Sequence, residues 1–335
     1  VKFADAANYT DVTGNDGATD VEAVAVVDTL SPDLAASGVE ITEANLNDAT
    51  NTSVVTITFT EAVTEFNNSD ITVTGGTLST VGSNDGGVTW SGIFTASDDS
   101  TANGTITIGT DYQDLVGNVG ADGGTDSVVV DTTNPTATVT FAQDGLDDDT
   151  NESLVTIVFS EAVANFSNAD VNVVGGTLGT LTSTDQITWT ATFTASDDST
   201  EEASVTVIGE YEDGVGNIGA TGADDTATVD TTNPTATIVF DKTSLKKETG
   251  GDGANESVVT ITFSEGVTAF SNEDLVVEGG TLTELVSSAG DTVWTGTFTA
   301  TDDSTANAKV KFADTANYTD VTGNDGATDV EAVAV

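Results

Sequence analysis

A set of short motifs occurs three times in this sequence, in the same order each time. The segment TFTEAV at 58–63 returns as VFSEAV at 158–163 and as TFSEGV at 262–267. The segment FTASDDST at 94–101 returns at 193–200 and, with one change, at 298–305. The aspartates at the unit boundaries, Asp28, Asp131 and Asp230, lie 103 and 99 residues apart. A period of this length is too long for a solenoid and predicts a tandem array of independent domains.

The repeats set the expected domain boundaries. Three complete domains are predicted at 28–131, 132–230 and 231–335. Residues 1–26 repeat residues 310–335 with one change, Ala6 against Thr315. We therefore interpret 1–27 as the C-terminal strands of a preceding repeat, which suggests a longer array. On its own this segment would fray or pair with a strand edge of a neighbouring chain, which is a route to self-association.

Apolar residues within each unit alternate with polar ones. Val55, Ile57 and Phe59 alternate with threonines, and so do Ile187, Trp189, Ala191 and Phe193. A period of two indicates strands with one face in a core and one in water. About seven short strands in roughly one hundred residues are typical of the immunoglobulin-like sandwich. The sequence thus predicts an all-β protein of tandem immunoglobulin-like Greek-key β-sandwich domains. Its tryptophans (Trp90, Trp189, Trp294) and unit-closing tyrosines (Tyr112, Tyr211, Tyr318) are expected to pack in the cores.

The charge of the chain limits its partners. Asp and Glu number 56 against 6 Lys and Arg, which gives a formal net charge of −50. This field repels nucleic acids and anionic membrane surfaces, so neither is expected as a partner, and no apolar run is long enough for membrane insertion. The same field attracts hard divalent cations, which prefer carboxylate oxygen. An acidic surface adapted to salty water is the compatible alternative.

The composition also argues against an enzyme. The sequence has no His and no Cys, which removes Ser-His and Cys-His mechanisms as well as disulfides and thiolate metal sites. Paired carboxylates could hydrolyse glycosides, but here each carboxylate motif recurs three times on a small sandwich without a long cleft. We expect no catalysis.

The segment VVDTTNPTATV at 129–139, the SEAV step at Ser160 and the Tyr-x-Asp-x-x-Gly-Asn run resemble bacterial Ig-like repeats. Such repeats occur in giant repeats-in-toxin and biofilm-associated adhesins, including the extender region of ice-binding adhesins. The resemblance covers almost the whole chain and implies an extracellular stalk at the bacterial cell surface, with domains stiffened by Ca²⁺ at the linkers. The first domain departs from the pattern, because DTLSPD at 28–33 replaces DTTNP.

The order of the strands indicates where acidic residues gather. Glu161 and the loop at Asp213 are expected at the N-terminal end of the second domain, and the Asp197-Asp198 loop at its C-terminal end beside Asp230. Acids of successive domains should then converge at each joint, where Ca²⁺ accepts six to eight oxygen ligands. The alternative is that these are ordinary turns with solvated acids. The expected ligands are Asp98, Asp99, Asp131, Asn134, Glu161 and Asp213, with Asn217 as a further candidate, at the first joint; Asp197, Asp198, Asp230, Asn233, Glu265 and Asp320 at the second; and Asp28, Glu61 and Asp114 at the start of the first domain.

A second candidate is Asp147-x-Asp149-x-Asn151, which resembles the opening of an EF-hand loop but lacks its Gly and terminal Glu. The corresponding residues are Asn47 and Asn51 in the first domain, and 251–255 in the third. Because the acids do not recur, metal binding is the less favoured interpretation of this loop.

The function expected from these features is a Ca²⁺-stiffened spacer whose partners are the neighbouring repeats of the same chain. It would project a distal binding domain from the cell. A filament or surface-layer protomer assembled by strand addition is the alternative. A module for glycan or ice is disfavoured, because the exposed threonines occupy ordinary outward strand positions.

Overall fold

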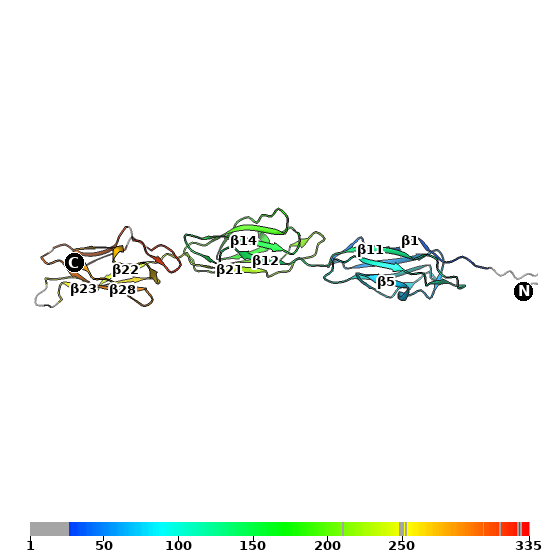
Figure 1. The fold of residues 1–335 in the computed structure, drawn as a ribbon, viewed down its shortest axis with the longest axis horizontal. Helices are drawn as coiled ribbons and strands as arrows, with labels where there is room; N and C mark the ends of the chain where they lie inside the picture. Colours follow the sequence, from blue (N-terminus) through cyan, green and yellow to red (C-terminus); the bar gives the residue numbers. More distant parts are fainter. Residues whose placement is uncertain are drawn as a thin grey trace, which may run out of the picture. The chain divides into compact units, whose positions relative to one another are not determined.

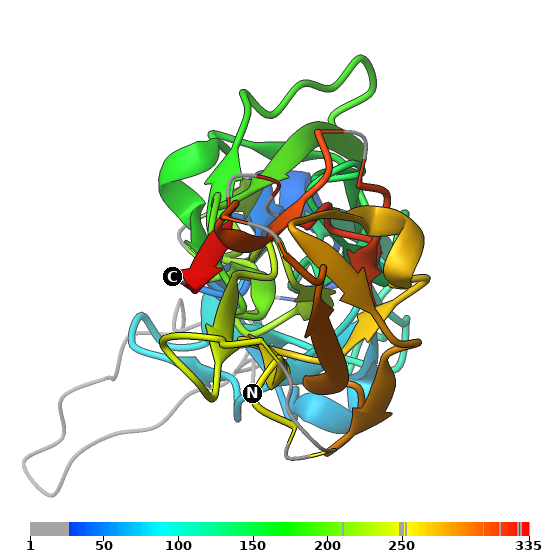
Figure 2. The same cartoon turned by 90° about the vertical axis from the view of Figure 1, so that its left-hand side faces the viewer.

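The computed structural model describes residues 27–209, 211–247, 251, 253–303, 305–314, 316–326, 328 and 330–334. The incomplete repeat expected at 1–27 lies outside the described residues, apart from Val27. The described chain consists of strands with three single turns of 3-10 helix (Figures 1 and 2). It contains no helix with the length and apolar character of a membrane span in the part that the structure describes.

The first domain begins with a long strand that pairs with the next long strand. Its elements are β1 (Leu34–Ile41), β2 (Asn45–Leu46), β3 (Thr52–Phe59), β4 (Val63–Thr64), η1 (Asn68–Asp70), β5 (Ile71–Thr74), β6 (Gly76–Leu78), β7 (Gly82–Ser83), β8 (Thr89–Ala96), β9 (Gly104–Ile108), β10 (Gln113–Asp114) and β11 (Gly124–Val130).

The second domain repeats this order without a counterpart of β7. Its elements are β12 (Ala137–Phe141), β13 (Gly145–Leu146), β14 (Glu152–Phe159), β15 (Val163–Ala164), η2 (Asn168–Asp170), β16 (Val171–Val174), β17 (Gly176–Leu178), β18 (Thr188–Ala195), β19 (Ala203–Val207), β20 (Glu212–Asp213) and β21 (Asp224–Val229).

The third domain follows a similar succession, with β27 at the place of β7 and no counterpart of β13 among the described strands. Its elements are β22 (Ala236–Phe240), β23 (Glu256–Phe263), β24 (Val267–Thr268), η3 (Asn272–Asp274), β25 (Leu275–Glu278), β26 (Gly280–Leu282), β27 (Val286–Ser288), β28 (Val293–Ala300), β29 (Ala308–Phe312), β30 (Thr319–Asp320) and β31 (Glu331–Ala334).

Each domain is a sandwich of two sheets, as the second shows. One sheet has the order β12-β14-β18-β17 and the other β13-β21-β19-β16. The chain crosses between the sheets at Gly175, whose φ of +74° joins β16 to β17. A short strand, β13, pairs in parallel with β21, and the two-stranded ladder β15–β20 closes one end of the domain. The expected all-β immunoglobulin-like fold is confirmed.

Three separate cores fill the three domains. The described chain divides into two compact units, with the boundary between Thr133 and Asn134. In β3 the alternation predicted for Val55, Ile57 and Phe59 buries all three, at 0, 0 and 2% exposure. The aromatic part of the second core joins Phe159, Phe166 and Tyr211, with ring centroids 4.7 to 5.8 Å apart. Burial of these side chains supplies the main stabilisation of each domain.

Two core assignments differ from the sequence expectation. Ile187 is 36% exposed, because β18 starts at Thr188 and Ile187 belongs to the preceding turn. The tryptophans are only partly buried and pack at the margin of each core. The indole N–H of Trp90 donates to the backbone oxygen of Gly87, whereas the buried indole nitrogen of Trp189 has no hydrogen-bond partner. The turn before Trp189 is one residue shorter than the turn before Trp90.

The tyrosines are buried, as expected. The Tyr112 hydroxyl donates to the backbone oxygen of Asp122 at 2.7 Å, and the Tyr211 hydroxyl donates to that of Ala220 at 2.8 Å. Each hydroxyl thereby ties the loop that follows β10 or β20 to the domain. That loop carries the buried aspartate of the candidate site.

Candidate metal centre

Three carboxylates lie together at the start of the first domain. Asp28 precedes β1, Glu61 lies in the turn between β3 and β4, and Asp114 ends β10. Each offers an oxygen, and these oxygens lie within 4.8 Å of one another. The group lines a cavity of about 220 Å³, which Leu115 and Val116 also line. The β4–β10 ladder, in which Val63 opposes Asp114, brings the turn of Glu61 beside the loop of Asp114.

Asp114 is 3% exposed and organises its own loop. Its Oδ1 accepts hydrogen bonds from the backbone N–H groups of Val116, Gly117 and Asn118, at 2.7 to 2.9 Å. Its Oδ2 accepts one from the Asn118 side-chain amide. These bonds favour the charged form and lower the pKa of Asp114, against a loss of hydration that acts in the opposite direction. A carboxylate oxygen can accept two hydrogen bonds, so Oδ2 keeps a lone pair for another ligand.

The pKa of Glu61 shifts in the opposite direction. Loss of hydration raises the pKa of Glu61 above its ordinary value, and the neighbouring charges of Asp28, Asp114 and Asp33 raise it further. The Oδ1 atom of Asp33 is buried and has no hydrogen-bond partner. A buried anionic oxygen without a donor is costly unless a cation or a proton balances it. Asp33 was not among the ligands expected from the sequence, because only the first domain has an acid at this position, where Thr136 and Thr235 stand in the others.

The third domain repeats the arrangement with Asp230, Glu265 and Asp320, whose oxygens also lie within 4.8 Å of one another. Asp320 is 2% exposed and accepts backbone hydrogen bonds from Thr322, Gly323 and Asn324. Loss of hydration, followed by the charges of Asp320 and Asp230, raises the pKa of Glu265. A hydrogen bond to Asp320 also favours the protonated form of Glu265.

In the second domain the structure brings together Glu161 and Asp213. Asp213 is 3% exposed and accepts the same three backbone hydrogen bonds, from Val215, Gly216 and Asn217. Asp131, which was expected with them, belongs to the first compact unit. Asn134 lies in the second unit, and its Oδ1 atom is buried without a hydrogen-bond partner.

Asn324 connects the second and third domains, which belong to the same compact unit. Its Oδ1 accepts a hydrogen bond from the backbone N–H of Asp148, at 2.7 Å, in a loop of the second domain. Its Nδ2 donates to the backbone oxygen of Asp230 at 2.8 Å, and to Asp320 Oδ2 at 2.9 Å. Asn324 is 1% exposed. The loop that holds the acidic site of the third domain is therefore also the loop that contacts the second. Asn324 and its equivalent Asn118 were not among the residues expected at the site, although the repeated Asp-x-x-Gly-Asn spacing was a signal for both.

The structure places several expected ligands differently. Asp98, Asp99, Asp197 and Asp198 are exposed and are not members of the acidic groups found among the described residues. Asp99 and Asp198 have φ values of +47° and +49°, a left-handed turn conformation that Asp tolerates well. Their loops do pack at the C-terminal end of each domain, where Thr132 and Thr231 donate to the backbone oxygens of Ser97 and Ser196. Asn233 is exposed.

The EF-hand-like loop has a local explanation. Asp147 Oδ1 accepts hydrogen bonds from the backbone N–H and the hydroxyl of Thr150. Asn47 Oδ1 accepts the same two bonds from Thr50 in the first domain. Since an amide serves as well as a carboxylate, the position needs an acceptor rather than a charge. Asp252, in the corresponding loop of the third domain, lies outside the described residues.

The donor set fits a hard divalent cation. Each group supplies carboxylate oxygens from separate loops, and Ca²⁺ accepts such ligands in flexible geometry. With neither His nor Cys in the sequence, the site has none of the nitrogen and sulfur ligands that zinc and copper prefer. The Oδ1 atom of Asp33, whose charge acts on Glu61, is a further buried acceptor without a hydrogen-bond partner.

Comparison with known proteins identifies relatives of the chain. A family model described as bacterial Ig-like domain matches residues 28–130, 131–229 and 230–335. These bounds differ by one residue from those expected at the first two domain ends. A search of curated protein sequences gave no match.

Two solved structures show weak similarity to the chain. A structure of Yersinia pseudotuberculosis InvD is 15% identical with a TM-score of 0.35, covering 88% of this chain and 96% of that one. Invasin, a bacterial integrin-binding protein, is 13% identical with a TM-score of 0.33. The match covers 81% of this chain and 55% of invasin, so the chain spans about half of that structure.

Proposed function

Because this chain belongs to the bacterial Ig-like domain family, which covers all three of its described domains, we propose that it is a Ca²⁺-stiffened extender of a large bacterial surface adhesin. The adhesin would be of the repeats-in-toxin or biofilm-associated type. The extender would lie outside the cell and project a distal ligand-binding domain, with no catalytic role of its own.

The junction at Asn324 is the observation that carries the proposal. Asp230 follows β21 of the second domain, whereas Glu265 and Asp320 belong to the third. A cation held by these three residues would bond the linker directly to the third domain, beside the hydrogen bond from Asp148 to Asn324. Bending at this linker would then break metal coordination as well as hydrogen bonds.

The charge of the chain supports the same mechanism. Carboxylates that lie within 4.8 Å of one another repel when all are ionised, and repulsion at a linker favours its opening. A divalent cation reverses the sign of this interaction, because each carboxylate is then attracted to the shared ion. Asp28, Glu61 and Asp114 offer an equivalent site to a repeat that precedes the first domain. Asp131, Glu161, Asp213 and Asn134 are the residues proposed for the first linker.

Small-angle X-ray scattering of the whole chain tests the proposal. In millimolar Ca²⁺ we expect a larger maximum dimension than in a chelator at the same ionic strength, because metal-free linkers bend. The variant Asp230→Asn/Glu265→Gln should lose part of this difference. The matched control Asp197→Asn/Asp198→Asn, which removes two exposed turn acids, should keep it. Equal maximum dimensions with and without Ca²⁺ would show that no bound ion stiffens the linkers, and would contradict the proposal.

A further inference from the structure

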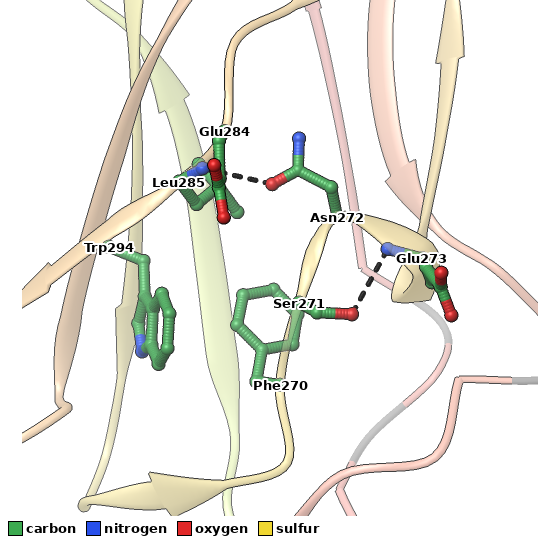
Figure 3. A pocket seen from close by; sticks show the side chains of 7 residues that line it. All are labelled: Phe270, Ser271, Asn272, Glu273, Glu284, Leu285 and Trp294. Atoms are coloured by element: carbon green, nitrogen blue, oxygen red, sulfur yellow. Dashed lines mark hydrogen bonds between the residues drawn. The ribbon is translucent and has the colours of Figure 1, made fainter.

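The third domain contains a cavity of about 530 Å³ at the edge of its core, which none of the acidic residues described above lines. Phe270 and Leu285 form its buried part, at 5 and 7% exposure. Trp294, on β28, forms a partly exposed wall (Figure 3). The rings of Phe270 and Trp294 stand nearly perpendicular, at 83°, with centroids 5.3 Å apart. The cavity thus offers an aromatic surface that a ligand can reach.

Most polar groups of this cavity are already engaged. Asn272 Oδ1 accepts from the backbone N–H of Leu285 at 2.9 Å, and its Nδ2 donates to the backbone oxygen of Thr283 at 3.0 Å. Ser271 Oγ accepts from the backbone N–H of Glu273 at 3.2 Å. These bonds fix the wall, and Figure 3 shows two of them. The remaining charged groups of the lining are the exposed carboxylates of Glu273 and Glu284.

The other two domains serve as internal references. They keep the aromatic pair in the same geometry, since the centroids of Phe66 and Trp90, and those of Phe166 and Trp189, are also 5.3 Å apart. They do not keep the two acids: Ser69 and Thr80 stand at these positions in the first domain, and Ala169 and Thr180 in the second. The aromatic pair is therefore part of the common fold, whereas the two carboxylates are particular to the third domain.

We infer that this cavity binds an organic cation, a guanidinium or ammonium group such as an arginine or lysine side chain of a partner protein. A cation over the face of a tryptophan is attracted by the ring, and carboxylates at the rim add charge-assisted hydrogen bonds. Neither Glu273 nor Glu284 has an ion pair with a lysine among the residues that the structure describes. A neutral sugar would gain from the ring but not from the two charges.

Nuclear magnetic resonance of the whole chain tests this site through the indole N–H signals of its three tryptophans. The signals can be assigned with Trp90→Phe and Trp189→Phe. The probe is N-acetyl-arginine amide, and the matched neutral probe is N-acetyl-citrulline amide, which has nearly the same shape. We expect a saturable shift of the Trp294 signal with the arginine probe and a shift at least about fivefold smaller with the citrulline probe, because a charge-assisted contact is lost. The signals of Trp90 and Trp189 report the non-specific attraction of cations to an acidic chain.

Two exchanges between domains complete the test. Glu273→Ser/Glu284→Thr installs the residues of the first domain and should reduce the Trp294 shift to the level of the citrulline probe. The reciprocal Ser69→Glu/Thr80→Glu should make Trp90 respond to the arginine probe. Each variant carries residues that a sister domain already accommodates, and unchanged remaining signals verify folding. Any of three results would overturn the assignment: equal shifts of the Trp294 signal with both probes, an unaltered Trp294 response after the first exchange, or no response of the Trp90 signal after the second.

Discussion

The buried aspartate of each site is a structural residue before it is a ligand. Asp114, Asp213 and Asp320 each accept three backbone hydrogen bonds on Oδ1, so the loop would leave three buried donors unsatisfied without them. Glu61 and Glu265 have no comparable set of backbone donors among the hydrogen bonds described. Loss of hydration and the neighbouring carboxylates raise the pKa of both, so theirs are the charges that the metal-free fold tolerates least.

This difference gives a prediction for Glu265→Gln. The raised pKa of Glu265 means that the metal-free fold holds this proton more tightly than the unfolded chain does. Stability without metal should therefore fall as pH rises from about 4.5 through the raised pKa, and the variant should lose this part of the pH dependence. Chemical denaturation of the parent chain and the variant in a chelator, at several pH values, measures this difference in the pH dependence of stability.

The same substitution should weaken calcium binding, although it removes a charge that destabilises the metal-free fold. Removing one charge from the ligand set should weaken Ca²⁺ binding at this site on the order of tenfold to a hundredfold, as titration calorimetry would record. A variant that is destabilised in the chelator at neutral pH, or that binds Ca²⁺ as well as the parent chain, would contradict this account. Asp197→Asn is the control for the loss of one negative charge elsewhere.

At the scale of elements, the loops that follow β10, β20 and β30 depend on close contact between a glycine and a buried tyrosine. A Cβ atom added to Gly219 would lie 1.9 Å from Cε2 of Tyr211, and the ring is fully buried. The Tyr211 hydroxyl also donates to the backbone oxygen of Ala220, the next residue. The ring and the loop therefore fix each other, and the loop in turn positions Asp213.

Gly219→Ala should destabilise the second domain by about 1–3 kcal/mol, the usual cost of forcing additional volume into a packed core. Gly214→Ala, in the same loop, meets no atom within 4 Å and should change little. Urea unfolding followed by Trp189 fluorescence, in a chain with Trp90→Phe and Trp294→Phe, isolates the domain. Similar stability losses for the two alanine variants would show that the tyrosine contact does not constrain the loop.

For the whole molecule, a net charge of −50 makes the response to ions the main variable of stability. Monovalent salt screens repulsion over all acids, with a screening length of about 8 Å at 0.15 M. A divalent cation held at defined sites stabilises the fold in a different manner, because it binds the folded state and not the unfolded one. The two contributions can be separated at constant ionic strength.

We expect Ca²⁺ to raise the midpoint of thermal unfolding well beyond NaCl of matched ionic strength. When the Ca²⁺ concentration is about one hundred times the dissociation constant of a site, binding adds about 2.7 kcal/mol to the free energy of unfolding. Each kcal/mol raises the midpoint of a domain of this size by about 4–8 °C. Differential scanning calorimetry in Ca²⁺, Mg²⁺ and NaCl measures the effect, with Mg²⁺ expected to be weaker because it prefers stricter geometry. Equal midpoints in the three salts would indicate screening alone.

Much of the architecture follows from the sequence by itself. The period of about one hundred residues predicted the tandem domains, and the two-residue alternation predicted the sandwiches. Both patterns can be read locally, because successive side chains of a strand point to opposite faces whichever strand lies beside it. The alternation predicted the buried faces of Val55, Ile57 and Phe59 correctly, but it failed at Ile187, which belongs to the turn that precedes β18. The repeated motifs also indicated Asp28, Glu61 and Asp114, which the structure brings together.

Tertiary structure decided what local sequence could not. Both Asp198 and Asp320 lie in short polar segments typical of turns. The first forms an exposed turn and the second a buried loop, and only the surrounding packing distinguishes the two. The contact of Asn324 with Asp148 joins residues 176 positions apart, and the unpartnered oxygen of Asp33 depends on which loops close over it. Burial, hydrogen-bond saturation and proximity are set by residues distant in the chain, so they arise only when the sheets have formed.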